Sequence, residues 1–289
     1  MAPADLNPLH GLLSGMEVEP GVGAALERLP DVTSVDTMLC GATASGRSSL
    51  ALHFALHHAA TANRPVMFLC RQDGLEGSMP LLPRLCASDN PCLHLLQLKY
   101  VRSYLDIQRF AACMHLLQTP LAALVVEDLS SLLRIDDRNT LVRTLAMLLE
   151  GVRSYRAASG CECPLLVTDS TDESRRPRYI FDRWFPLTLA ISAAAGPSGT
   201  EGQAFVLSVG GPLASTTQAS GAQSRPHEGA EGPVSVQPAG QSAGVTYRLV
   251  DDHFVLERVH EAGRGVAARQ AGAREGTHGA AAAPVQLFL

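Results

Sequence analysis

One stretch near the N-terminus constrains the fold of this chain more than any other. A short apolar run leads into a loop bounded by two glycines and then into a helical pattern, in the sequence Thr37-Met-Leu-Cys-Gly41-Ala-Thr-Ala-Ser-Gly46-Arg47-Ser48-Ser49-Leu50. Gly41 and Gly46 stand five positions apart and Ser48 follows, which is the spacing of a phosphate-binding loop. Glycines allow backbone conformations in which successive N–H groups point at an anion, and the following helix adds the positive end of its dipole.

The predicted nucleotide site is this loop, in which backbone amides hold the phosphates and the Ser48 hydroxyl contacts Mg²⁺. Its residues are Gly41, Ala42, Thr43, Ala44, Ser45, Gly46, Arg47, Ser48 and Ser49. An alternative is a strand-to-helix turn, rich in glycine, alanine and serine, that binds no ligand. The apolar strand before the loop and the helix after it favour nucleotide binding.

Arg47 occupies the position where such loops usually carry lysine. Because a guanidinium group is wider, planar and forked, it does not reproduce the contacts of an ammonium group. Lys99 is the only lysine in the chain, so a general drift from lysine to arginine accounts for the exchange. We expect nucleotide binding in weakened form, with slow hydrolysis.

With 289 residues, 46% of them hydrophobic, the chain is long enough for one α/β domain and additional segments. Its net charge of −5 argues against a generally basic surface, so any DNA contact must come from a local patch. The seven cysteines are irregularly spaced, and we see neither a secretory leader nor a long apolar segment. We therefore expect free thiols, a reducing intracellular compartment and no membrane contact.

Apolar runs typical of buried strands alternate with helical patterns from the loop onward. This pattern predicts an α/β fold whose mostly parallel sheet has helices on both faces and is closed by antiparallel strands. We expect helices over residues 48–60, 104–118 and 138–158. We expect strands over residues 65–70, 93–101, 121–128, 163–168, 184–191 and 203–209, and a hairpin of residues 245–250 and 253–259.

Changes in composition suggest the domain boundaries. We expect a flexible N-terminal segment (1–30), a phosphate-loop domain (31–209), a disordered Gly/Ser/Ala/Gln/Pro-rich insertion (210–243), a C-terminal hairpin that completes the core (244–261) and a disordered tail (262–289). The chain has no internal repeat.

A second signal is the run Leu121-Ala-Ala-Leu-Val-Val-Glu127-Asp128, an apolar strand that ends in two acids. In phosphate-loop NTPases such a strand places a carboxylate beside Mg²⁺. A buried strand that ends in acids is common, and its weight here comes from its place after the phosphate loop. We predict Ser48, Glu127 and Asp128 as the Mg²⁺ site, and the sequence leaves open which acid faces the ion.

His53 and His57 lie four residues apart on the first expected helix, a spacing that can hold a metal ion. The sequence offers no obvious third ligand, and Cys161 and Cys163 lack the second cysteine pair of a zinc site. We expect a core or solvated histidine pair and free thiols.

The phosphate loop, the strand that ends in acids and the closing antiparallel segment resemble the RecA-type recombinase ATPases. Within that superfamily the sequence is similar to a family of small, divergent recombinase paralogues, the SWIM-type zinc-finger-associated ATPase subunits of the Shu complex. The similarity covers roughly residues 37–190. It rests on Pro65-Val-Met-Phe-Leu-Cys-Arg-Gln72, Ser78-Met-Pro80, Leu96-Gln-Leu-Lys-Tyr100 and Arg183-Trp-Phe-Pro186, in their order after the loop.

This resemblance implies a RecA-like core and an accessory subunit of homologous recombination that binds ATP and Mg²⁺. It implies weak, DNA-stimulated ATP hydrolysis or none. It also implies single-stranded DNA, a SWIM-type zinc-finger protein and a recombinase or its paralogues as partners, and a nuclear location.

Three positions depart from the recombinase pattern. The glutamate that activates water falls at or near Gln72 and Asp73, of which the first cannot take a proton and the second is shorter. Glu127 and Asp128 both stand at the metal-binding acid. The strand ending at residue 168 leads into Asp169-Ser170, where recombinases sense the γ-phosphate with an amide. These departures favour binding over turnover.

The predicted DNA-binding residues lie in a basic stretch with interleaved aromatic residues. They are Arg175, Arg176, Arg178, Tyr179 and Arg183. Arginines neutralise phosphates, and an aromatic ring can stack on a base. The other interpretation is a solvated basic loop whose aromatic residues face the core, and the neighbouring Trp184 in particular is expected to pack inward.

Two alternative functions stay open on the sequence alone. A small-molecule phosphoryl transferase would need a complete catalytic acid and an arginine-rich lid, for which residues 175–183 are the candidate. A scaffold that has lost its nucleotide would keep the fold for protein interfaces.

Overall fold

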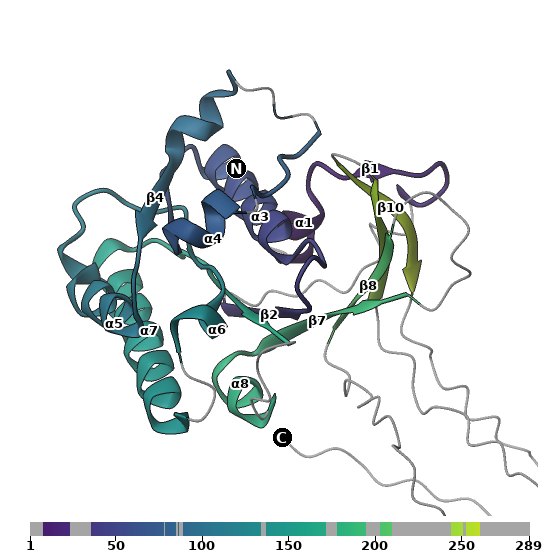
Figure 1. Cartoon of the computed structure of the whole chain (residues 1–289). Helices are drawn as coiled ribbons and strands as arrows, with labels where there is room; N and C mark the ends of the chain where they lie inside the picture. Colours follow the sequence, from purple (N-terminus) through teal and green to yellow (C-terminus); the bar gives the residue numbers. More distant parts are fainter. Residues whose placement is uncertain are drawn as a thin grey trace, which may run out of the picture.

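The computed structural model describes residues 8–23, 36–77, 79–84, 86, 89–133, 137–171, 178–194, 203–209, 244–250 and 253–260. Within these residues a ten-stranded sheet has the order β1-β10-β9-β8-β7-β2-β6-β5-β3-β4 (Figure 1). The expected α/β class is confirmed, because all neighbouring strands from β7 to β4 run parallel and helices pack on both faces.

The parallel half of the sheet contains the strands that the apolar runs predicted. In spatial order they are β7 (Leu187–Ala193), β2 (Asp36–Gly41), β6 (Leu165–Ser170), β5 (Ala123–Val126), β3 (Val66–Cys70) and β4 (Leu96–Tyr100). Every side chain of β5 and β6 is buried, because helices cover both faces of these central strands. Parallel pairing brings the carboxyl ends of the strands to one edge, where Gly41 lies in register with Ser170.

The antiparallel half of the sheet continues beyond β7. The strands β8 (Gln203–Val209), β9 (Gly244–Val250) and β10 (His253–His260) pair in succession, and β1 (Glu17–Val18) adds parallel to β10. Tyr247 and Phe254 point into the core that this half shares with the first long helix. The expected hairpin strands are confirmed, and their turn at residues 251–252 lies outside the described residues.

Two layers of helices cover the sheet. Helices α1 (Pro8–Leu13) and α3 (Arg47–Ala62) pack on one face, and α5 (Tyr104–Cys113) and α7 (Arg138–Ser159) pack on the other (Figure 1). The short helices are α4 (Gln72–Gly77), α6 (Leu129–Leu132), α8 (Arg178–Trp184), η1 (Pro91–Leu95) and η2 (Met114–Leu116).

Local structure differs from expectation in three places. Residues 8–23 form α1 and β1 within the segment that was expected to be flexible, because Leu9, Leu12 and Leu13 bury an apolar face against α3. Residues 72–77 form α4, where no helix was expected. The strand expected from residue 93 starts at Leu96, after the turn η1, whose Cys92 N–H donates to the Asn90 side chain.

The expected insertion (210–243) and tail (262–289) lie outside the described residues, and they stay predictions. Among the described helices, none is long and apolar enough to cross a membrane.

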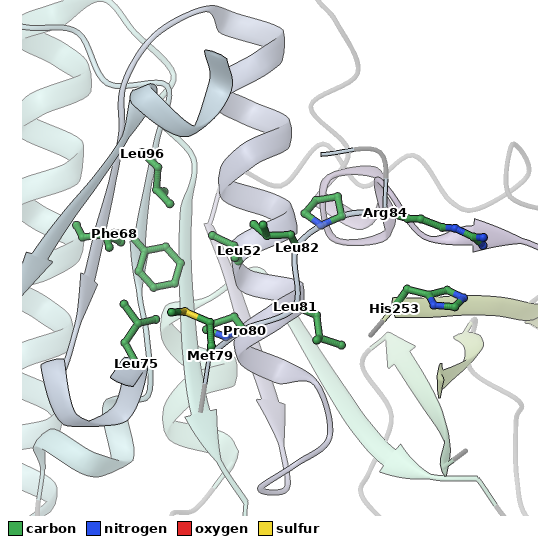
Figure 2. A pocket seen from close by; sticks show the side chains of 12 residues that line it. Leu52, Phe68, Leu75, Met79, Pro80, Leu81, Leu82, Arg84, Leu96 and His253 are labelled. Atoms are coloured by element: carbon green, nitrogen blue, oxygen red, sulfur yellow. The ribbon is translucent and has the colours of Figure 1, made fainter. Parts of the chain in front are cut away.

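An apolar groove of about 720 Å³ lies beside the edge of the sheet that ends in β4 (Figure 2). Leu52 of α3, Phe68 of β3 and the outer strand β4 face the segment 79–84 across it. Arg84 and His253 stand at one end. Met79 and Leu98 are 77% and 43% exposed, so the groove presents apolar side chains to solvent.

Candidate functional site

The loop between β2 and α3 has the compact form that its glycines predicted. The Ser45 N–H and hydroxyl both donate to the Ala42 carbonyl, at 3.3 and 2.7 Å, and close a tight turn. Thr43 and Ala44 at the tip are exposed, and Ala44 adopts the left-handed conformation with φ 60°. A non-glycine residue seldom adopts this conformation, which is concentrated at functional sites.

Both glycines of the motif are required by close approaches. A Cβ on Gly41 would lie 2.7 Å from the Ser45 hydroxyl and 3.0 Å from the Ile191 side chain of β7. Gly46 has φ 79°, and a Cβ there would lie 2.7 Å from the Phe254 ring of β10. The loop therefore fits between α3 and the sheet only with glycine at these positions.

Helix α3 begins at Arg47 with Gly46 as its N-cap, and this glycine has no side chain that could accept from the first amides of the helix. The first amides of a helix have no partner within the helix, and they carry its positive partial charge. The loop tip and the uncapped start of α3 together form a site suited to an anion.

Arg47 turns inward instead of projecting from the loop. Its side chain is 9% exposed; Nη1 donates to the Gly41 carbonyl at 2.7 Å, and Nη2 pairs with Asp128 Oδ1 at 3.0 Å. The guanidinium group therefore fastens the base of the loop to the end of β5. To reach a phosphate it would have to give up these contacts.

Ser48 and Glu127 meet beside the start of α3. The Ser48 hydroxyl donates to Glu127 Oε1 at 2.6 Å. Burial raises the pKa of Glu127 above its ordinary value, although the hydrogen bond from Ser48 opposes that shift. Of the two acids that the sequence offered, Glu127 faces Ser48 and Asp128 faces Arg47.

Asp128 belongs to a network that links three strand ends. Its backbone has φ 52°, its N–H donates to Thr168 Oγ1 at 2.8 Å, and its carboxylate accepts from the Ser130 hydroxyl at 2.6 Å. The Ser130 hydroxyl in turn accepts from the Ser170 N–H at 3.3 Å. Asp169 is buried beside it in β6. Because Asp128 also pairs with Arg47, the carboxyl ends of β5 and β6 are tied to the loop between β2 and α3.

The residues beside the loop fit Mg²⁺. The Ser48 hydroxyl and the Glu127 carboxylate are oxygen ligands, which Mg²⁺ prefers, and their contact brings them to one point at the start of α3. The two acids beside a single guanidinium group leave negative charge for a cation to balance. Bound there with a nucleotide, the ion would neutralise phosphate charge.

Gln72 and Asp73 have other contacts than the predicted catalytic ones. The Gln72 amide donates to Glu76 Oε1 at 2.9 Å, because α4 places these side chains one turn apart. Asp73 forms an ion pair with Arg71, whose Nη1 also donates to the Ser131 carbonyl. The hydrogen bond from Arg71 lowers the pKa of Asp73. Both side chains are thus engaged at the surface of α4.

The predicted DNA-binding residues fall only partly within the described structure. Arg175 and Arg176 lie outside it, and Arg178 begins α8. Tyr179 is 64% exposed and Arg183 is also exposed. Trp184 packs against the core, as expected.

Ser49 was predicted to line the nucleotide site. Its side chain faces away from the loop opening, since its hydroxyl accepts from the Leu81 N–H at 2.9 Å.

Two histidines of α3 are buried. His53 packs edge-on against Phe254, and burial lowers its pKa to about 4. Burial likewise lowers the pKa of His58 to about 3. Among the residues that the structure describes, no three or more histidine, cysteine or acidic side chains gather in a group that could hold a metal ion.

Sequence reasoning missed the residues beneath the loop. The Tyr247 hydroxyl donates to the Ser45 carbonyl at 2.7 Å, and Phe254 lies against Gly46. Both come from the hairpin of β9 and β10. The only sequence signal for them is the alternation of apolar and polar residues in these strands, which predicts that Tyr247 and Phe254 face inward.

No protein-family model matches this chain, and no curated protein matches it. Among solved structures, the chain is similar to one described as the crystal structure of the RadB recombinase. The match has a TM-score of 0.46 and 14% sequence identity, and it covers 78% of this chain and 90% of that one. A likeness this distant does not show a family, and the site itself has to support any function.

Proposed function

We propose that this protein is a RecA-type, nucleotide-binding accessory subunit that uses ATP and Mg²⁺ as ligands. The observation that carries the proposal is the contact between Ser48 and Glu127 beside the uncapped start of α3. It brings oxygen ligands for Mg²⁺ to the point where helix amides would meet phosphates. The glycine spacing and the compact loop support the same function.

Three contacts favour binding over rapid hydrolysis. Arg47 is held by Gly41 and Asp128, so no cation of the loop is free to follow the γ-phosphate. Gln72 and Asp73 are engaged with Glu76 and Arg71. If Asp73 stays paired with Arg71 and does not take a proton from the attacking water, the reaction lacks its general-base contribution of roughly 10²–10⁴. We infer a weak ATPase or none.

The biological role that we propose is homologous recombination in the nucleus, with single-stranded DNA, a SWIM-type zinc-finger protein and a recombinase or its paralogues as partners. The sequence resemblance supports this role. The exposed Tyr179 and Arg183 of α8 suit a nucleic-acid contact. The apolar groove with Met79 and Leu98 suits a protein partner, because contiguous exposed apolar surface marks interaction sites.

The nucleotide proposal is tested by titrating the full chain with a fluorescent ATP analogue, with Mg²⁺ and with EDTA. Ser48→Ala should weaken binding about tenfold and remove most of the Mg²⁺ dependence, because it deletes a metal ligand. Ser49→Ala is the matched control: it removes the neighbouring hydroxyl, which bonds Leu81, and should leave the affinity unchanged. No binding by the wild type would support the nucleotide-free scaffold instead, and an equal loss of affinity in both variants would refute Ser48 as a metal ligand.

The DNA proposal is tested by a variant in which Arg175, Arg176 and Arg178 are alanine. Binding of single-stranded DNA should weaken, and its salt dependence should flatten, because fewer phosphates are neutralised. The matched control removes the same charge from the α5–α7 layer, where three exposed arginines are Arg109, Arg143 and Arg153. Equal losses in the two variants would refute a site at residues 175–183.

The partner proposal is tested by co-purification with a SWIM-domain protein. Leu98→Glu places a charge in the groove and should abolish capture. Leu116→Glu, at an exposed position of η2 outside the groove, should not. Capture that survives Leu98→Glu would exclude the groove as the interface.

A further inference from the structure

The underside of the phosphate loop rests on the C-terminal hairpin. The Tyr247 hydroxyl of β9 donates to the Ser45 carbonyl at 2.7 Å, although the two residues are 202 positions apart. Tyr247 is fully buried between Phe205, at 5.7 Å between ring centroids, and Phe254, at 5.5 Å. Its ring therefore has a fixed position from which the hydroxyl reaches the loop.

The hydrogen bond to Ser45 fixes the direction of a neighbouring amide. In a trans peptide the C=O and N–H groups point in opposite directions, and no cis peptide occurs among the described residues. With the Ser45 carbonyl directed at the hairpin, the Gly46 N–H is directed away from it, on the side of the loop opposite Tyr247. This is the amide at the N-cap of α3.

Phe254 supports the same peptide from β10. Its ring occupies the space that a Gly46 Cβ would need, at 2.7 Å, and His53 of α3 packs edge-on against it at 5.5 Å. Gly46 holds its left-handed φ of 79° directly above this ring. The loop, the start of α3 and the hairpin are thus packed as one unit.

We propose that Tyr247 is a positioning residue for the phosphate loop, which orients the Ser45–Gly46 peptide so that its N–H faces a bound phosphate. The inference rests on the proposed nucleotide site, and it gives the antiparallel half of the sheet a part in ligand binding. Tyr247 itself touches no ligand, because it is buried beneath the loop.

The test compares two tyrosine-to-phenylalanine variants of the full chain. Tyr247→Phe removes only the hydroxyl that bonds Ser45. Tyr155→Phe removes the hydroxyl of an equally buried tyrosine in α7, far along the chain from the loop. That hydroxyl accepts from the Leu121 N–H at 2.6 Å. Both variants should lose comparable thermal stability.

The readouts are the affinity for a fluorescent ATP analogue with Mg²⁺ and hydrogen exchange of the loop amides. Tyr247→Phe should weaken binding about tenfold, because the Gly46 N–H is no longer held toward the phosphate before binding, and it should speed exchange in residues 42–48. Tyr155→Phe should change neither.

Each outcome has one meaning. If the wild type binds nucleotide and Tyr247→Phe binds equally well, the positioning role is overturned while the proposed function stands. If the wild type binds no nucleotide, the proposed function fails, and the exchange data still decide whether Tyr247 orders the loop. Unchanged exchange in Tyr247→Phe would overturn the inference in that case.

Discussion

The two halves of the sheet contribute differently to the candidate site. The parallel half supplies polar groups from its strand ends: Ser48 after β2, Glu127 and Asp128 after β5, and Thr168 in β6. The antiparallel half supplies aromatic groups from below, Tyr247 and Phe254. One half therefore supplies the polar groups of the candidate site, and the other supports the loop from below.

The two halves differ in how far apart in the sequence the residues lie that position the loop. In the parallel half, strand–helix–strand connections place successive strand ends at one edge by topology alone. In the antiparallel half, a residue near the end of the described chain fixes a loop near its beginning. A ligand that orders the loop would also favour docking of the hairpin, because the two are packed together.

The largest expected effect comes from removing the aromatic support. Phe254→Ala should destabilise the fold by about 3–5 kcal/mol, since it empties a fully buried site. Phe68→Ala, equally buried in β3 of the parallel half, should cost a similar amount. After correction for the folded fraction in urea titrations, only Phe254→Ala should bind the ATP analogue more weakly.

Phe254→Leu, which leaves a smaller cavity, allows the same comparison if the alanine variant does not fold. Equal nucleotide affinity of the Phe254 and Phe68 variants would remove the distinction between the two halves.

An intermediate effect, a loss of folding stability, is expected when the pH is lowered. Burial holds the folded-state pKa of His53 near 4 and of His58 near 3, below the ordinary value of 6.5. Each imidazole therefore contributes stability that is present above pH 6.5 and is lost as the pH falls towards its folded-state pKa. Between pH 7 and 5 the loss should be on the order of 2 kcal/mol for each ring.

Urea unfolding at several pH values measures this loss. His53→Gln should remove about half of the acid slope, and adding His58→Gln should remove most of the rest. A slope that neither substitution changes would show that other groups cause the acid sensitivity.

The smallest effect is expected far from the loop. Asp137 caps α7, where its carboxylate accepts from the Thr140 N–H at 2.9 Å. Asp137→Ala should cost about 1 kcal/mol in thermal or urea unfolding, and Asp137→Asn should cost less, because asparagine also caps helices. Neither should alter nucleotide affinity, and a change would show that the helical layer is coupled to the site.

The sequence predicted the parts of the site that follow from local pattern. The glycine spacing marked the loop, and the apolar run before Glu127 marked the strand end that lies beside it, because both signals lie within one stretch of chain. The sheet class followed from alternating strands and helices.

The rest depended on contacts between distant segments. Arg47 turns inward because Asp128 lies beside it. Gln72 bonds Glu76 because both lie on the short helix α4, which was not expected because Gly74 and Gly77 disfavour a helix. Tyr247 gave no local signal, since a buried aromatic in a strand is usually part of the core. The helix α1 was not predicted because its apolar residues form only a short run next to a proline.

The most direct test of the central claim is the Mg²⁺ dependence of ATP-analogue binding by the wild type and by Glu127→Gln. We predict that the wild type binds with Mg²⁺ and loses most of its affinity in EDTA. Glu127→Gln should bind about tenfold more weakly with Mg²⁺ and show little change in EDTA, because its amide no longer offers a carboxylate to the ion. Binding that neither EDTA nor Glu127→Gln weakens would contradict a phosphate and Mg²⁺ site at the strand ends of the parallel half.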